Sequence, residues 1–209
     1  GGIILASGSS QGGNGPDAGN ISFGSTLEAT SGLAALTAYE DGIPLVTGMD
    51  LNYPDQVGSV FAAAAIVAAL HATHRSGAGA HLDISQRELA TYLLGEAIMT
   101  AAHGEAGARG NASPEFLLQD AFATKDGWIA ISLKDEQDVL RALALAAPHM
   151  AGANSRDIAA CKGALSAWTS AKTSQDVCAR LNASGLAAAI VCNGKDAWQQ
   201  QAGGEKPSG

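Results

Sequence analysis

The stretch that decides the fold runs from Asn52 to Gln86 and reads NYPDQVGSVFAAAAIVAALHATHRSGAGAHLDISQ. It opens with a turn that carries a single carboxylate, Asp55, and continues as an almost wholly apolar segment of helical length. A basic, glycine-broken turn then leads into a short run of β-type residues, HLDIS. This order predicts a helix, a turn and a strand of an α/β core. Because residues 57–70 have no polar face, we expect the helix to be sandwiched between other layers.

Two further elements are predicted before this stretch and one after it. Residues 3–6 are a short apolar run typical of a strand, and the SGSSQGGNGPDAG that follows is as rich in glycine as a phosphate-binding loop. It lacks the Gly-Lys-[Ser/Thr] of a P-loop, so a surface loop is the simpler interpretation. Leucines at near-helical spacing over 26–37 predict a short helix interrupted at Ser31-Gly32. Residues 86–102 predict one helix with a single buried stripe.

The composition changes at His103, where the chain reads HGEAGARGNASP, a pattern typical of a flexible linker. We therefore predict a large α/β domain over 1–103 with a parallel, partial Rossmann-like sheet, a linker over 104–115, and a small α+β domain over 116–192. The elements predicted for the small domain are a hairpin over 116–133, helices over 135–147, 155–168 and 173–183, and a strand over 187–192. Trp128 and Trp168 are expected in its core, and the polar residues 193–209 are predicted to be a disordered tail.

The composition also argues against several classes of function. A net charge of -8 and a pI near 4.9 leave no basic surface to replace phosphate counterions, so no nucleic-acid partner is expected. The cysteines Cys161, Cys178 and Cys192 are too widely spaced for a CxxC motif, which predicts free thiols and no metal site. The sequence shows no signal peptide and no apolar run judged long enough to span a bilayer, so we predict a cytoplasmic protein without a membrane partner.

Several of these residues, taken together, resemble a known family. A carboxylate, then Gly-[small]-apolar, then an Ala-rich helix that ends in H-x-x-x-R-[ST]-G-x-G-x-x-[LIV]-D-[LIV]-S-Q, is similar to the class III coenzyme A transferases, the CaiB/BaiF family. The similarity continues upstream through Ser22-Phe23-Gly24 and downstream over 110–133, and it covers about 3–192. Full members are considerably longer. The resemblance therefore implies that this chain lacks their N-terminal part and their C-terminal return segment.

The resemblance implies a covalent mechanism centred on Asp55. From the residues alone, an Asp just before a helical run is a preferred N-cap. The resemblance instead implies that Asp55 is the nucleophile, and the two roles are compatible because a helix N-terminus keeps a carboxylate ionised. Asp55 would attack an acyl-CoA thioester and form an acyl-aspartyl anhydride with release of the CoA thiolate. A carboxylate acceptor would then exchange in, and the thiolate would take up the new acyl group.

The same resemblance implies that backbone near the bound thioester comes from the glycine-rich segments. The candidate binding residues are Gly8, Gly58, Gly107, Gly110 and Asn111. A plain surface loop at Gly8 and a plain linker at 107–111 remain the alternatives, and amides near Gly58 are the expected oxyanion donors. Coenzyme A would be a substrate as its thioester rather than a permanently bound cofactor. The implied partners are acyl-CoA, a carboxylate and a second copy of the chain in an interlocked homodimer.

Two other functions stay open. An acyl-CoA racemase of the same family needs a base on each side of the thioester α-carbon, and the histidine of that branch has no counterpart in residues 21–25. A non-catalytic fragment of the fold, expected to bind CoA weakly, is the other alternative. His81, Asp83 and Ser85 alternate along one face of the predicted strand, but three residues of one strand cannot by themselves form a hydrolase triad.

Overall fold

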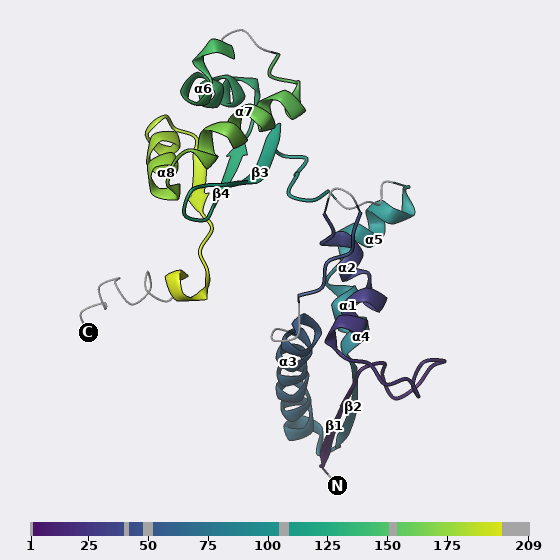
Figure 1. Cartoon of the computed structure of the whole chain (residues 1–209). Helices are drawn as coiled ribbons and strands as arrows, with labels where there is room; N and C mark the ends of the chain where they lie inside the picture. The colour runs from purple at the N-terminus through teal and green to yellow at the C-terminus, as the bar shows by residue number, and fades with distance from the viewer. Residues whose placement is uncertain (1, 40–41, 48–51, 105–108, 151–153, 198–209) are drawn as a thin grey trace, which may run out of the picture. The chain divides into compact units, whose positions relative to one another are not determined.

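The computed structural model describes residues 2–39, 42–47, 52–104, 109–150 and 154–197. The chain divides into two compact units, unit 1 over Gly1–Gly110 and unit 2 over Asn111–Gly209, so the division falls inside segment 104–115. Figure 1 gives the elements of both. The mixed α/β class expected from the sequence is confirmed.

Unit 1 is built around two parallel strands and a long helix. Strands β1 and β2 pair in register from Ile4 with Ala80 to Ser9 with Ser85, which confirms a parallel sheet. The elements of unit 1 are β1 (Ile4–Ser9), α1 (Gly24–Ser31), α2 (Leu33–Leu36), α3 (Tyr53–Ser76), β2 (Ala80–Ser85), α4 (Gln86–Tyr92) and α5 (Gly95–Ala102).

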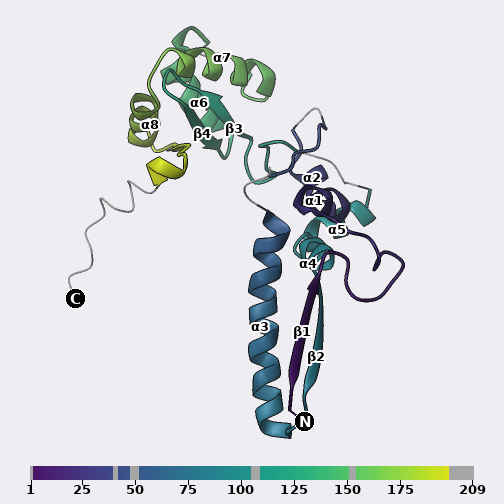
Figure 2. The same ribbon diagram turned by 60° about the horizontal axis from the view of Figure 1, so that its bottom comes forward.

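Helix α3 runs alongside both strands and in the opposite direction to them (Figure 2). It ends at Gly77, whose φ of 72° is the left-handed conformation that glycine adopts readily, and the chain turns there into β2. The N-terminal end of α3 therefore lies at the carboxyl ends of β1 and β2. In open α/β sheets, this is the edge at which ligands bind.

Two expectations about α3 need correction. The helix has 24 residues and a mean hydropathy of 1.6 over its most apolar 18, so by length and composition it is long enough to cross a membrane, contrary to the sequence analysis. Core helices of soluble proteins pass the same test, and this is weak evidence for a span. The helix is also not sandwiched. One side packs on β1, β2, α1 and α4, but Val60, Val67 and Leu70 are exposed and only 11% of the apolar window is buried.

The single helix predicted over 86–102 is wrong, because the structure has two. Helix α4 ends at Tyr92, and the amide of Leu94 donates to the carbonyl of Thr91 (3.0 Å) in a turn before Gly95. Glycine at this point favours a break, since it is a poor residue for a helix interior. The interruption predicted at Ser31-Gly32 is confirmed. Gly32 has a φ of 94° and separates α1 from α2.

Unit 2 is an antiparallel sheet covered by helices. Strand β4 is central, with β3 and β5 antiparallel on its two sides. The elements are β3 (Leu118–Ala123), β4 (Trp128–Leu133), α6 (Glu136–Ala146), the 3-10 turn η1 (Pro148–Met150), α7 (Ile158–Ser170), α8 (Ser174–Ala183) and β5 (Ala187–Ile190). The last described residues, 194–197, form a helical turn whose first amides donate to Asn193 Oδ1.

One continuous apolar core holds unit 2 together. Ile129, Ile131 and Leu133 of β4 are completely buried, and they pack with buried residues of α6, α7 and α8. Trp168 lies partly buried against this core. Trp128 does not, because it is on the other face of β4 and 53% exposed, so its predicted core position is wrong. The three cysteines are free thiols.

Candidate active site

Asp55 is the third residue of α3 and is exposed at the end of the helix next to the strand ends. It is not the N-cap. That role belongs to Asn52, whose Oδ1 accepts a hydrogen bond from the backbone amide of Asp55 (3.4 Å). Pro54 at the second helical position suits a first turn, because the missing amide proton would have no helical partner there. The carboxylate of Asp55 is therefore not used to satisfy the helix backbone.

The described residue that holds the Asp55 carboxylate is Gln86. Its side-chain Nε2 donates a hydrogen bond to Asp55 Oδ1. Gln86 is the first residue of α4 and follows β2 directly, and Ser85 before it caps α4 by accepting from the amide of Glu88 (3.2 Å). Gln86 was not predicted to have a role at the site, although it is the last residue of the motif that carries the family resemblance.

The cap of α3 is in turn fixed by a close approach of α1. A Cβ atom placed on Gly24, the first residue of α1, would lie 2.3 Å from Asn52 Cγ. Only glycine leaves room for the Asn52 side chain at this position, because real Cβ contacts of that length do not occur. Three helix N-termini, those of α1, α3 and α4, are thus brought together around Asp55 by Asn52 and Gln86.

The glycine-rich segment after β1 is anchored at the same strand ends. The amide of Gly13 donates to both carboxylate oxygens of Asp83 (2.9 Å each), and Arg87 Nη1 pairs with Asp17 Oδ2 at 2.8 Å. Asp83 thus organises the loop. The rejected triad stays rejected, because the hydrogen-bond partner of His81 Nε2 is Ser7 Oγ of the neighbouring strand (3.0 Å) and Asp83 is occupied by the loop.

The predicted binding residues are not all brought to Asp55. Gly58 is in α3, and a Cβ there would lie 3.3 Å from Gln86 Cγ, so its small size serves the Gln86 side chain. A Cβ on Gly8 would meet nothing within 4 Å. Gly110 has a φ of 55° and ends unit 1, whereas Asn111 belongs to unit 2 and donates from Nδ2 to Asp120 Oδ1 (2.9 Å). Gly107 lies outside the described residues.

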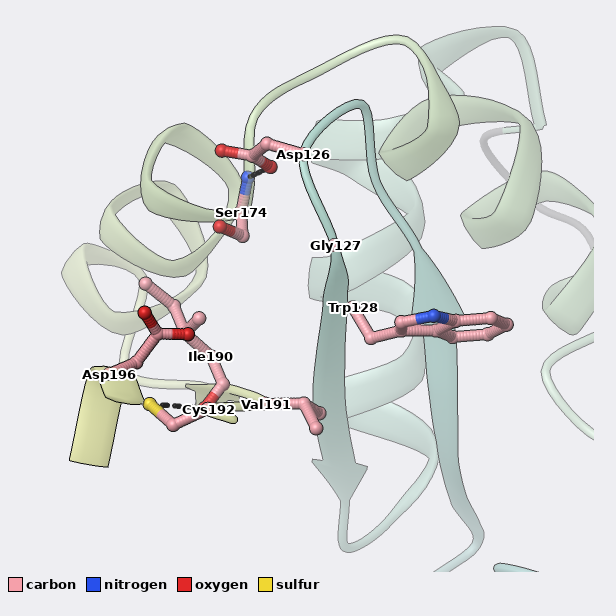
Figure 3. A pocket seen from close by; sticks show the side chains of 8 residues that line it. All are labelled: Asp126, Gly127, Trp128, Ser174, Ile190, Val191, Cys192 and Asp196. Carbon is pink, nitrogen blue, oxygen red and sulfur yellow. Dashed lines mark hydrogen bonds between the residues drawn. The ribbon is translucent and has the colours of Figure 1, made fainter. Parts of the chain in front are cut away.

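Unit 2 contains a pocket of about 490 Å³, which is a second place to look for a site (Figure 3). Its polar groups are largely engaged with one another: Asp126 Oδ1 accepts from the amide of Ser174 (2.7 Å), Asp196 Oδ2 accepts from the amide of Asn193 (3.2 Å), and Cys192 Sγ donates to the carbonyl of Ile190 (3.7 Å). Asp126 thus sits at the start of α8 as a structural contact. Within the described segments, no group of three or more His, Cys, Asp or Glu side chains is placed to hold a metal ion.

The sequence and the fold of the chain can be compared with those of known proteins. The sequence matches the family described as "CoA-transferase family III" over residues 2–206. The chain belongs to this family. Acetyl-CoA:oxalate CoA-transferase of Acetobacter aceti is 36% identical over 126 residues, which are 59% of this chain and 32% of that protein. Succinyl-CoA–D-citramalate CoA-transferase of Chloroflexus aurantiacus is 31% identical over 156 residues, 72% of this chain and 38% of that protein.

The fold of this family III chain is also that of solved relatives. A CaiB/BaiF family protein from Brucella suis superimposes with a TM-score of 0.84 at 23% identity, over 96% of this chain and 56% of that one. Rv3272 from Mycobacterium tuberculosis superimposes with a TM-score of 0.66 at 23% identity, over 92% of this chain and 53% of that one. The chain thus spans about a third of the curated relatives and just over half of the solved ones.

Proposed function

We propose that this chain carries the nucleophile of a coenzyme A transferase, which moves CoA from an acyl-CoA to a carboxylate acceptor, and that the nucleophile is Asp55. The observation that supports the proposal best is the state of the Asp55 carboxylate. The carboxylate is exposed and lies in the first turn of a 24-residue helix, at the carboxyl ends of parallel strands. It is not needed as the helix cap, because Asn52 is the N-cap.

The position suits a carboxylate that must attack. The first turn of a helix favours negative charge through the helix dipole, so the group stays ionised and available as a nucleophile. Its direction is fixed by Gln86, which keeps one oxygen engaged. A fixed direction matters because near-attack geometry supplies a large part of the rate enhancement in such transfers.

The proposed reaction keeps all atoms and charges in balance. One carboxylate oxygen of Asp55 bonds to the thioester carbonyl carbon, the C–S bond breaks, and CoA leaves as the thiolate. The resulting anhydride exchanges its acyl partner with the acceptor, because the acceptor carboxylate adds to the aspartyl carbonyl and the donor acid leaves as its carboxylate. The thiolate then attacks the new acyl carbonyl and regenerates the Asp55 carboxylate.

The relatives support small carboxylic acids as the substrate class. Their names give acetyl-CoA with oxalate, and succinyl-CoA with D-citramalate or, in the Mus musculus protein, glutarate. For this chain we infer an acyl-CoA donor and a carboxylate acceptor, with CoA bound only as substrate. We also infer a cytoplasmic protein that acts as a homodimer, the assembly implied by the family resemblance.

The decisive experiment compares Asp55→Asn with Asp176→Asn in the native polypeptide. Asp176 is the matched control, because it occupies the same third position of α8 and pairs with Arg180 (2.8 Å). Each protein is mixed with acyl-CoA, the acylated carboxyl group is trapped with hydroxylamine, and the modified residue is mapped by mass spectrometry. We expect a label on Asp55 in wild type and in Asp176→Asn, and neither label nor transfer in Asp55→Asn.

Folding is followed in parallel by far-UV circular dichroism. Asp55→Asn is expected to leave the spectrum unchanged, because Asn52 caps α3. Transfer by Asp55→Asn, or a label on another residue, would contradict the proposal. Deuterium uptake at the thioester α-carbon from D₂O, without transfer, would indicate the racemase, and the absence of any acylation would indicate a non-catalytic fragment.

A further inference from the structure

The contact between Gln86 and Asp55 joins two elements whose positions are fixed independently. Gln86 is held at the start of α4 by the strand before it and by the Ser85 cap, and Ser85 is buried. Asp55 is held in the first turn of α3 by Asn52. Helices α3 and α4 pack against each other in unit 1 (Figure 2). The hydrogen bond therefore joins two helix N-termini that other contacts already hold in place.

Gly58 provides the space for the Gln86 side chain to reach Asp55. A Cβ atom on Gly58 would be 3.3 Å from Gln86 Cγ, closer than most side chains approach each other. Gly58 is buried and lies one helical turn after Asp55. The stem of Gln86 passes over it, and the amide group then meets Asp55 Oδ1.

The hydrogen bond from Gln86 to one oxygen of the Asp55 carboxylate gives the two oxygens different roles. Gln86 Nε2 occupies Oδ1, so Oδ2 is the oxygen presented for attack. After acylation through Oδ2, Oδ1 is the carbonyl oxygen of the aspartyl group, and the same N–H lies on it. When the acceptor adds to that carbonyl, negative charge develops on Oδ1, where a preoriented donor stabilises the transition state.

We propose that Gln86 is a positioning residue for Asp55, which directs Oδ2 to the thioester and then stabilises the charge on Oδ1 during exchange. This inference rests on the proposed role of Asp55 and adds a residue to it. Loss of a donor to a developing oxyanion lowers kcat by about 10²-fold or more. KM for the acyl-CoA is expected to change by no more than about twofold, because the interaction strengthens in the transition state rather than in the bound substrate.

The first test uses two substitutions with matched controls. Gln86→Met keeps the length of the side chain without the donor. Gln86→Glu restores a donor only while the introduced carboxyl is protonated. The controls are Gln137→Met and Gln137→Glu, because Gln137 is an exposed glutamine in the first turn of α6. Transfer is measured from pH 5 to pH 8, together with the hydroxylamine label on Asp55.

The expected pattern is specific to the proposed contact. Gln86→Met lowers kcat at every pH, whereas Gln86→Glu recovers activity relative to wild type as the pH falls and loses it as the introduced carboxyl ionises. Both Gln137 variants follow wild type. Wild-type kcat in Gln86→Met, or a pH profile of Gln86→Glu parallel to wild type, would overturn the inference. If wild type carries no label on Asp55, the proposed function fails instead, so the two failures are distinguishable.

The second test needs no turnover. The side-chain NH₂ signals of Gln86 are assigned by NMR in wild type and in Asp55→Ala. The hydrogen-bonded proton is expected downfield in wild type and shifted upfield in the variant, while the Gln137 signals stay in place. Unchanged Gln86 signals in Asp55→Ala would contradict the contact itself.

Discussion

The two units differ in how they use their buried residues. In unit 2, strands and helices share one apolar core with large side chains, including Ile129, Ile131 and Leu165, which are completely buried. In unit 1, the buried apolar side chains within the described segments are Leu27, Pro54 and four alanines, and the longest helix leaves Val60, Val67 and Leu70 exposed. The candidate site is in unit 1, the unit with the smaller core.

This difference indicates that the apolar core lies mainly in unit 2, whereas the contacts that shape the candidate site lie in unit 1. Unit 2 has the contacts expected of a small domain that folds on its own, because most of its apolar side chains are removed from water. In unit 1, two close approaches at glycines place Asp55, namely Gly24 against Asn52 and Gly58 against Gln86. We therefore expect substitutions in unit 2 to appear as changes in stability and comparable ones in unit 1 to appear as changes in activity.

The largest effect is expected for Leu165→Ala. Truncation of this buried leucine should lower the free energy of unfolding of unit 2 by about 2 to 5 kcal/mol, through lost burial and a cavity. Val67→Ala, at a residue of α3 that is 65% exposed, should stay within about 0.5 kcal/mol. Urea unfolding of Leu165→Ala is followed by tryptophan fluorescence, which reports unit 2 because all three tryptophans lie there. Unfolding of Val67→Ala is followed by far-UV circular dichroism, which also reports the helices of unit 1, including the 24-residue α3. Equal effects of the two substitutions would remove the contrast between the units.

A smaller change in stability, but a large one in activity, is expected for Gly24→Ala. The added Cβ displaces Asn52 from the cap of α3 at a cost of about 1 kcal/mol, and it disturbs the first turn that carries Asp55. Gly163→Ala in α7 is the control, because a Cβ there meets nothing within 4 Å and Ala is the better helix former. Transfer assays and circular dichroism on both variants test this. Full activity in Gly24→Ala would show that the close approach is irrelevant to the site.

The smallest effect is the acid sensitivity of unit 2. Burial raises the pKa of Asp120, but hydrogen bonds from Lys162, Asn111 and the amide of Ala121 outweigh it and leave the pKa below the ordinary 3.8. The hydrogen bond from the amide of Ser174 likewise lowers the pKa of Asp126. A carboxyl group with a lower pKa in the folded state stabilises it above the unfolded pKa, and this contribution is lost as the pH falls through the folded value.

Unit 2 should therefore unfold at lower urea concentration at pH 3 than at pH 6. Asp120→Asn should reduce this difference, because the substituted amide no longer titrates. Asp196→Asn is the control, because the Asp196 carboxylate accepts its hydrogen bond from a nearby backbone amide, that of Asn193 (3.2 Å), and not from another helix or strand. An unchanged urea midpoint of wild type between the two pH values would contradict the assignment of stability to these carboxylates.

Much of the fold follows from local patterns in the sequence. The apolar run of α3, the alternation in β2 and the glycine at position 32 are patterns along one segment each, and each predicted the element that is observed, although the run did not predict how α3 packs. The same reasoning could have placed Trp128 correctly. Because residues alternate across a strand and Ile129, Ile131 and Leu133 fill the core, residue 128 must point away from it.

The site was only partly predictable, for a physical reason. Asn52 carries a local signal, because an Asn followed three residues later by an Asp, with Pro between them, fits a helix start at Asn52 better than one at Asp55. Gln86 carries none. Its contact with Asp55 depends on the packing of α4 against α3, and the need for a small residue at Gly58 becomes visible only when Gln86 lies beside it.

The two units also differ in how far apart in the sequence their paired strands lie. In unit 2, Ala123 meets Trp128 across a tight hairpin, so this pairing closes a very short loop. In unit 1, Ile4 pairs with Ala80, and α1, α2 and α3 lie between these two residues in the sequence. Closing long loops slows folding because the entropy is lost before the contacts form. On the ribosome, β1 leaves the exit tunnel long before β2 is made, and until then it has unpaired backbone groups that other extended chains can bind.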